Sequence, residues 1–237
     1  MKKWIKSFFQ FMNYEIYRTS KFGIHIFHRK YGARMNNMDR YERQVAPTIR
    51  GIRIDHRARY RLACDYIRNE GKILDFACGI GYGAYLLSRN PHSTEIDAVD
   101  KSHESIAYAN RYYHSSKIAY KAEHDSHFDP AMNHYDLIVS FETIEHLEQV
   151  DAYLKRIARS LKSSGVFICS TPNQAVIPFH PVMSKYHLRH YTPLEFGRLL
   201  QTNGFNVIEQ KSQQFQFSSK ISDNWDGRYL IAICTKL

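Results

Sequence analysis

An acid and imidazole cluster occupies the stretch SFETIEHL, residues 140–147. Glu142, Glu145 and His146 stand at positions i, i+3 and i+4, the spacing that places side chains on one face of a helical turn. Such a group can serve as a general base, can bind a divalent metal, or can simply put negative charge at the start of a helix. The elements around the cluster decide among these three interpretations.

The positive charge of the chain is concentrated at its start. The formal net charge is +10; residues 1–70 hold 16 Lys+Arg and 6 Asp+Glu, whereas residues 71–237 hold 17 of each. A basic segment on a neutral core favours an anionic partner, such as phosphate groups, a membrane surface or nucleic acid. We therefore expect a basic, aromatic appendage over residues 1–55 and a separate domain over residues 56–237.

The composition favours a cytoplasmic protein. No apolar run approaches the roughly 20 residues that cross a bilayer, and the basic, aromatic start lacks the features of a signal peptide. The four cysteines are far apart and form no CxxC pair, which argues against a zinc ribbon or a disulfide framework. A basic helix near the start can still lie on the inner face of the membrane.

Strand and helix patterns alternate from residue 72 onward. Short apolar or alternating runs predict strands at 72–77, 94–100, 117–123, 135–141, 166–173, 206–210 and 228–235. Helical periodicity and end signals predict helices at 84–90, 102–113, 147–162 and 192–205. This order predicts an α/β fold with a mostly parallel sheet, and the last two strands, which have no helix between them, should pair in antiparallel fashion.

A glycine-rich turn follows the first of these strands. Gly79, Gly81 and Gly83 let the backbone turn tightly beside a ligand, and Asp100 ends the second strand, where a carboxylate can accept ribose hydroxyls. The run from Gly79 through Gly81 to Ala84 also satisfies the dinucleotide-binding pattern. An NAD-linked oxidoreductase and a non-catalytic nucleoside-binding module are therefore alternatives.

Four motifs, in this order along the chain, narrow the choice among these protein classes: ILDFACGIGYG, IDAVD, YDLIVSFETIEHL and LKSSGVFICSTPN. Together they resemble the class I S-adenosylmethionine-dependent methyltransferases over about residues 56–235. The resemblance implies a Rossmann-like seven-stranded sheet with helices on both faces, an antiparallel last strand, and S-adenosylmethionine as cofactor. The upstream segment 42–63 is similar to bacterial methyltransferases associated with surface-polysaccharide and glycosyltransferase genes.

The resemblance also implies how the cofactor is held. Asp75 and Gly79 would carry its amino-acid end, Asp100 would hold the ribose, and an acid after the third strand would contact the adenine. For that last role the sequence offers Glu123, His124 and Asp125. The expected cofactor-binding residues are Asp75, Ala77, Gly79, Gly81, Asp100, Lys101, Asp125 and Glu142.

The acceptor side is expected around His146 and the loop 174–191. His146 suits a base near neutral pH. In similar methyltransferases a His-x-Arg-x-aromatic run lines the acceptor pocket, and His187, Arg189 and Tyr191 match it. The expected catalytic residues are His146, His187 and Tyr191.

The E-x-x-E-H spacing additionally resembles a metal site in quinone and small-RNA 3′-end methyltransferases. There Glu142, Glu145 and His146 would be ligands, with His187 or His190 as a further one. We expect no resident metal, because an E-H pair before an apolar residue also occurs in methyltransferases without one. A metal-dependent quinone or RNA 2′-O-methyltransferase is the alternative within the family.

The favoured function is transfer of a methyl group to oxygen on a small-molecule or glycan-linked acceptor. A phosphorylated or lipid-linked acceptor is compatible with the basic segment. Nucleic acid is not expected as a partner, because the chain shows charge but no RNA-binding motif.

Overall fold

The computed structural model describes residues 14–19, 23–28, 44–68, 70–215 and 217–237. The chain forms two compact units, Met1–Pro47 and Thr48–Leu237, whereas the sequence-based boundary lies after residue 55. In the first unit two strands pair in antiparallel fashion; they are β1 (Tyr14–Thr19) and β2 (Gly23–His28). The basic helix expected near the start falls outside the described residues.

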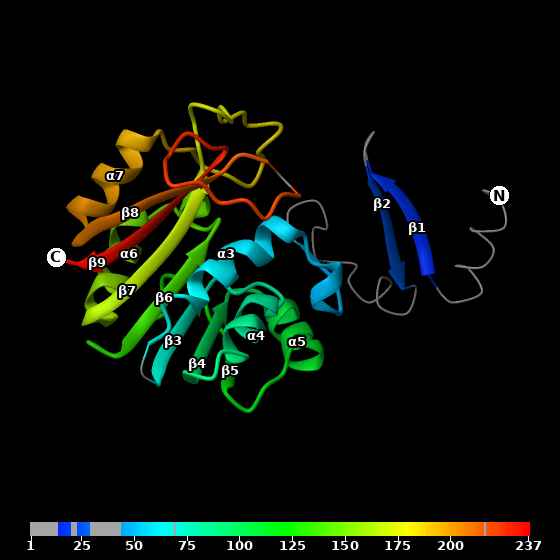
Figure 1. The fold of residues 1–237 in the computed structure, drawn as a ribbon, viewed down its shortest axis with the longest axis horizontal. Coiled ribbons are helices and arrows are strands. Elements are labelled where there is room, and N and C mark those ends of the chain that lie inside the picture. The colour runs from blue at the N-terminus through cyan, green and yellow to red at the C-terminus, as the bar shows by residue number, and fades with distance from the viewer. Residues whose placement is uncertain (1–13, 20–22, 29–43, 69, 216) are drawn as a thin grey trace. The chain divides into compact units, whose positions relative to one another are not determined.

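The second unit is built on one seven-stranded sheet (Figure 1), in the order β5-β4-β3-β6-β7-β9-β8. Its strands are β3 (Gly71–Phe76), β4 (Ser93–Asp100), β5 (Ile118–Ala122), β6 (Tyr135–Phe141), β7 (Leu161–Pro172), β8 (Phe205–Gln213) and β9 (Tyr229–Lys236). Neighbours pair in parallel except around β9, which is antiparallel to both β7 and β8. The predicted sheet, with its antiparallel closing pair, is confirmed.

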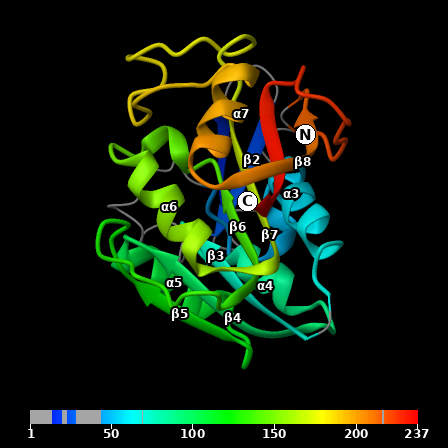
Figure 2. The ribbon, with the colours of Figure 1, turned by 90° about the vertical axis from the view of Figure 1, so that its left-hand side faces the viewer.

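Helices cover both faces of the sheet, as expected (Figure 2). The elements are η1 (Ile49–Gly51), α3 (Ile54–Cys64), α4 (Tyr82–Ser88), α5 (His103–Tyr112), η2 (Ile144–His146), α6 (Val150–Ser160) and α7 (Pro193–Thr202). Alternate strand residues face opposite ways, so Leu74 joins the core under α6 and α7 whereas Ile73 joins the core under α3 and α4. This two-sided burial explains why the central strands read as continuous apolar runs.

The helix after the acid cluster starts later than expected. Residues 144–146 form a single 3-10 turn, and α6 begins only at Val150. Glu142 lies before that turn with a φ of +52°, a conformation that side chains other than glycine rarely adopt. Of the two glutamates expected in the first turn of a helix, Glu145 lies in the first turn of the 3-10 helix η2, whereas Glu142 lies outside any helix.

The start of α7 follows its sequence signal closely. The Thr192 hydroxyl accepts a hydrogen bond from the Glu195 backbone N–H, and the Glu195 carboxylate accepts one from the Thr192 N–H at 2.8 Å. Pro193 occupies the first turn. This capping box fixes the point at which the long loop after β7 returns to the core.

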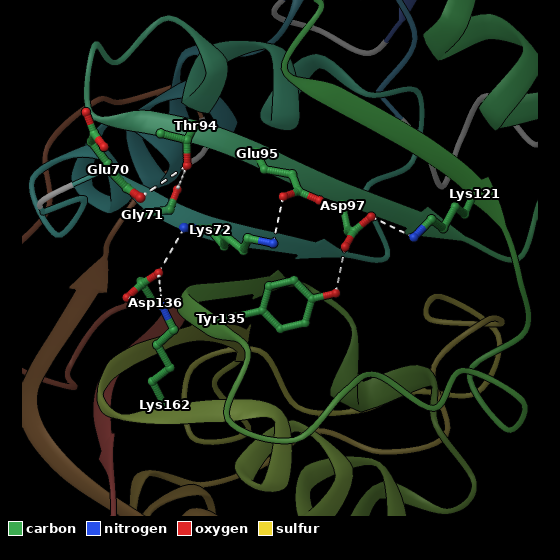
Figure 3. Close-up of polar contacts among 10 residues, drawn as sticks. All are labelled: Glu70, Gly71, Lys72, Thr94, Glu95, Asp97, Lys121, Tyr135, Asp136 and Lys162. Atoms are coloured by element: carbon green, nitrogen blue, oxygen red, sulfur yellow. Dashed lines mark hydrogen bonds and ion pairs between the residues drawn. The ribbon is translucent and has the colours of Figure 1, made fainter.

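A polar network joins β4, β5 and β6 through Asp97, Lys121 and Tyr135 (Figure 3). The buried carboxylate of Asp97 accepts a hydrogen bond from the Tyr135 hydroxyl at 2.8 Å and pairs with Lys121 at 2.7 Å. A more exposed ion pair links Lys72 to Glu95 at 2.8 Å. The network ties β4 to β6 across β3.

The described helices include none that combines the length and apolarity needed to span a bilayer. All four cysteines are free thiols.

Candidate active site

The expected functional residues gather at the carboxyl edge of the sheet. The turn 77–81 follows β3, Asp100 ends β4, and Glu142 follows β6. Because β4, β3 and β6 are adjacent and parallel, these strand ends meet at one edge. This is where ligands bind in open α/β sheets.

The glycine turn leaves room for a ligand at one position and none at another. Gly79 has a φ of +56°, and a Cβ placed there would meet nothing within 4 Å. A Cβ on Gly83 would instead lie 1.9 Å from the Tyr60 ring. Gly79 therefore borders an open cradle, whereas Gly83 is required for packing of α3 against α4. Ala77, at the start of the turn, also has a positive φ of 60°.

Asp100 is held rigidly by the backbone around it. One carboxylate oxygen accepts from the Gly79 N–H and the other from the Ser102 N–H, each at 2.9 Å. These bonds fix the carboxylate beside the glycine turn, in the position expected to hold a ribose. The neighbouring Lys101 is exposed.

Asp75 is a buried acid with an incomplete set of partners. Its Oδ1 accepts from the Tyr60 hydroxyl at 3.1 Å, while no donor among the described residues reaches Oδ2. Burial raises the pKa of Asp75 to about 7. An unpaired buried carboxylate oxygen fits a cationic group, such as the ammonium of an amino acid. Sequence reasoning did not anticipate the Tyr60 contact, although Tyr60 belongs to the upstream segment 42–63.

Asp125 lies in the loop after β5. Its carboxylate is 3.0 Å from the His124 ring, and its backbone oxygen accepts from Arg156 at 2.7 Å. The preceding Glu123 donates its N–H to the Asp100 carbonyl at 3.0 Å. The loop thus joins the edge that carries Asp100, and adenine contact by Asp125 stays a prediction.

The two glutamates of the cluster have different surroundings. Glu142 accepts from the Ser170 hydroxyl at 2.7 Å. Glu145 is fully buried; its Oε2 accepts from Thr171 at 3.3 Å, and within the described part of the chain Oε1 receives no hydrogen bond. Burial, followed by the charge of Glu142, raises the pKa of Glu145. Ser170 and Thr171 come from β7, and no sequence signal pointed to them.

A chain of imidazoles approaches Glu145 from the 174–191 loop. The Nδ1 atom of His190 lies 2.7 Å from the Ile177 carbonyl oxygen, and its Nε2 atom lies 2.7 Å from Nδ1 of His187. A carbonyl only accepts, so Nδ1 of a neutral His190 carries the proton and its Nε2 accepts from His187. His187 therefore presents an unprotonated Nε2.

His146 is oriented in the same way. Its Nδ1 lies 2.9 Å from the Tyr186 carbonyl oxygen, which assigns the proton of the neutral ring to Nδ1 and leaves Nε2 unprotonated. The rings of His146 and His187 have centroids 4.6 Å apart. Burial, and then the neighbouring His146 and His190, lower the pKa of His187 to about 4.

Three ligand-type atoms consequently converge. One atom each of Glu145, His146 and His187 lies within 4.8 Å of the other two. One carboxylate and two neutral imidazoles suit zinc, manganese or iron. Of the ligands that the sequence offered, this set contains Glu145, His146 and the further histidine His187, and it leaves out Glu142.

Tyr191 lies in the core rather than on an open surface. It is 6% exposed, and its hydroxyl has no hydrogen-bond partner among the described atoms. Burial raises its pKa to about 12. Arg189 is exposed nearby. A catalytic role for Tyr191 stays a prediction.

Comparison with known proteins settles the family. Residues 41–210 match the model of a methyltransferase domain. The chain belongs to this family. S-adenosylmethionine is accordingly the cofactor of this methyltransferase, and the fit is supported by the open cradle at Gly79 and the unpaired oxygen of Asp75. The NAD-linked alternative is set aside.

Two curated relatives illustrate the range of the family. A probable S-adenosylmethionine-dependent methyltransferase of Mycolicibacterium smegmatis is 30% identical over 139 residues, 57% of this chain and 52% of that protein. A ubiquinone biosynthesis O-methyltransferase of Bradyrhizobium diazoefficiens is 28% identical over 178 residues, 68% of this chain and 69% of that protein. The match thus spans only about half of the first relative.

Solved structures agree on the fold. An S-adenosylmethionine-dependent methyltransferase from Mesorhizobium loti superposes with a TM-score of 0.63 at 14% identity, covering 77% of this chain and 100% of that one.

Proposed function

We propose that this methyltransferase methylates an oxygen of a small-molecule or glycan-linked acceptor, bound against Glu145, His146 and His187. The observation that carries the proposal is the convergence of one ring nitrogen each of His146 and His187 with a carboxylate oxygen of the buried Glu145, at the edge where the cofactor fold places its ligand. The similarity to a ubiquinone biosynthesis O-methyltransferase supports oxygen as the methylated atom.

We assign the following roles to the cofactor and to the residues of the chain. Bound S-adenosylmethionine supplies an electrophilic methyl group. Asp75 and Asp100 hold and orient the cofactor, so that methyl and acceptor meet in line. His146 accepts the hydroxyl proton at Nε2, and the Tyr186 carbonyl stabilises the resulting imidazolium through Nδ1–H. His187 remains neutral near pH 7 because of its lowered pKa.

The test is methyl transfer from labelled S-adenosylmethionine to a panel of catechols, hydroxyquinols and sugar hydroxyls. For the acceptor that is methylated, His146→Ala should lower kcat by about 10²–10⁴. Affinity for S-adenosylhomocysteine should stay unchanged, because His146 is assigned to the acceptor. Full activity of His146→Ala would contradict the proposed base.

A second candidate, a metal-dependent methyltransferase, is favoured by one specific observation. The ligand-type atoms of Glu145, His146 and His187 lie within 4.8 Å of one another, and Oε1 of Glu145 has no donor among the described residues. A bound divalent ion would polarise the acceptor oxygen and lower its pKa.

Metal binding can be measured without turnover. Under this second candidate, calorimetric titration of the metal-stripped chain with Zn²⁺ or Mn²⁺ should show one site, weakened at least about tenfold in His187→Ala. Equal affinity of wild type and His187→Ala would exclude this site. Methyl transfer that persists after complete metal removal would favour the base without metal.

A further inference from the structure

Large apolar side chains are exposed mainly at one edge of the second unit. Among the described residues, eleven large hydrophobic residues are exposed, and eight of them lie at the carboxyl edge of the sheet; the eight are Val176, Val182, Met183, Tyr186, Leu188, Leu194, Phe215 and Phe217. Val182 and Met183 are the most exposed of all, at 78% and 87%. Such a concentration is unusual for a surface that meets only water.

These residues come from two loops and the start of α7. The 174–191 loop follows β7, and the 214–228 loop precedes β9, which pairs with β7 through Pro172 and Tyr229. The Asn173 side-chain amide donates to the Gly227 carbonyl at 2.9 Å, joining the bases of the loops. Figures 1 and 2 both place the two loops at the same end of the sheet.

Basic side chains accompany the apolar ones at this edge. Residues 174–191 include no Asp or Glu, whereas the 214–228 loop holds Asp223, which pairs with Lys211 at 2.7 Å, and Asp226. Lys185, Arg189 and Lys220 are exposed among the apolar side chains. The Phe217 ring lies 5.2 Å from the guanidinium of Arg53, which pairs with the buried Asp55.

We propose that the 174–191 and 214–228 loops dock on an anionic lipid bilayer. Isolated aliphatic and aromatic side chains at loop tips can enter the acyl boundary, while interspersed lysine and arginine meet acidic headgroups. The core of a protein interface is instead depleted of charge, so this alternation favours lipid over a second protein. The docked edge also carries His146 and His187, so an acceptor in the membrane would reach the site directly. Both loops belong to the second unit, Thr48–Leu237.

The test is co-sedimentation of the full chain with phosphatidylcholine vesicles containing about one-third phosphatidylglycerol. Wild type should bind, and the double variant Val182→Asp/Met183→Asp should bind at least about tenfold more weakly. Met132→Asp is the matched control, because Met132 is an exposed methionine, 65% accessible, just before β6 at the opposite edge. It should bind like wild type. Equal loss in both variants, or no loss in the double variant, would overturn the proposal.

A second measurement reports insertion at the loop itself. Tryptophan placed by Met183→Trp should be quenched by brominated phosphatidylglycerol vesicles, whereas Met132→Trp should not be. Retained affinity for S-adenosylhomocysteine shows that each variant is folded. Equal quenching at the two positions would contradict docking. Self-association of the chain that covers the 174–191 loop in place of lipid would also contradict it.

Discussion

Asp75 links cofactor binding to pH. Burial raises its pKa from 3.8 to about 7, so the folded chain keeps a proton that the unfolded chain has already lost. The free energy of unfolding of the ligand-free protein should therefore fall as pH rises from about 4 to about 7. A cofactor ammonium beside Oδ2 favours the ionised form of Asp75. Cofactor binding should therefore offset this fall in the free energy of unfolding.

Affinity for S-adenosylhomocysteine should consequently rise between about pH 5.5 and pH 7.5, with proton release on binding. Calorimetry at pH 6 in two buffers of different ionisation enthalpy measures the released proton. In Asp75→Asn the release should vanish. Proton release that persists in Asp75→Asn would assign it to another group.

His190 should act as the residue that positions His187. Removing its acceptor nitrogen with His190→Phe lets the proton of His187 move to Nε2, so that His187 no longer presents an unprotonated nitrogen there. We expect kcat to fall about 10–100-fold. Nitrogen NMR shifts of the His187 ring should show the changed tautomer, which loss of packing alone would not produce.

His190→Gln, which restores an acceptor oxygen, should recover part of the activity. The exposed His92, on the loop before β4, provides the control, and His92→Phe should leave the His187 spectrum unchanged. An unaltered His187 tautomer in His190→Phe would refute the assigned role.

At the scale of elements, the Asp97–Tyr135 bond should stabilise the sheet. Tyr135→Phe removes a buried hydrogen bond to a carboxylate, and we expect the free energy of unfolding to fall by about 1–3 kcal/mol in urea titrations. Lys72→Ala breaks an ion pair with two exposed partners and should change stability little. Equal effects of the two substitutions would contradict a buried, ordered network.

The order of elements was predictable because local signals agree with the fold. Continuous apolar strands, the glycine turn and the Thr192–Glu195 box each specify one local structure. The antiparallel closing pair followed from the missing helix between β8 and β9. The start of β7 was missed, because Leu161 pairs with Tyr135 before the register shifts, five residues earlier than the apolar run indicated.

The candidate site was predictable only in part. Glu145 and His146 are adjacent in sequence, but Thr171 reaches Glu145 from β7 and His187 reaches His146 from a loop 41 residues farther along the chain. Contacts of this kind depend on sheet register and loop course, which no short pattern encodes. The Tyr60–Asp75 bond likewise depends on how α3 packs over the turn.

At the scale of the molecule, two different parts of the chain are suited to contact with an anionic partner. The excess positive charge of the sequence lies in residues 1–70, whereas the exposed apolar loops belong to the second unit. Raising NaCl to about 0.5 M should weaken vesicle binding, because salt screens the basic side chains. Quenching of the tryptophan in Met183→Trp then reports the apolar contact that remains.

The account rests on one arrangement: the cofactor lies on the turn after β3 and faces the Glu145–His146–His187 group. A crystal structure of the chain with S-adenosylhomocysteine tests it directly. We expect the ribose hydroxyls on Asp100, the ammonium beside Asp75, and the sulfur facing His146 across open space. A ligand bound elsewhere, or a sulfur turned away from His146, would contradict it.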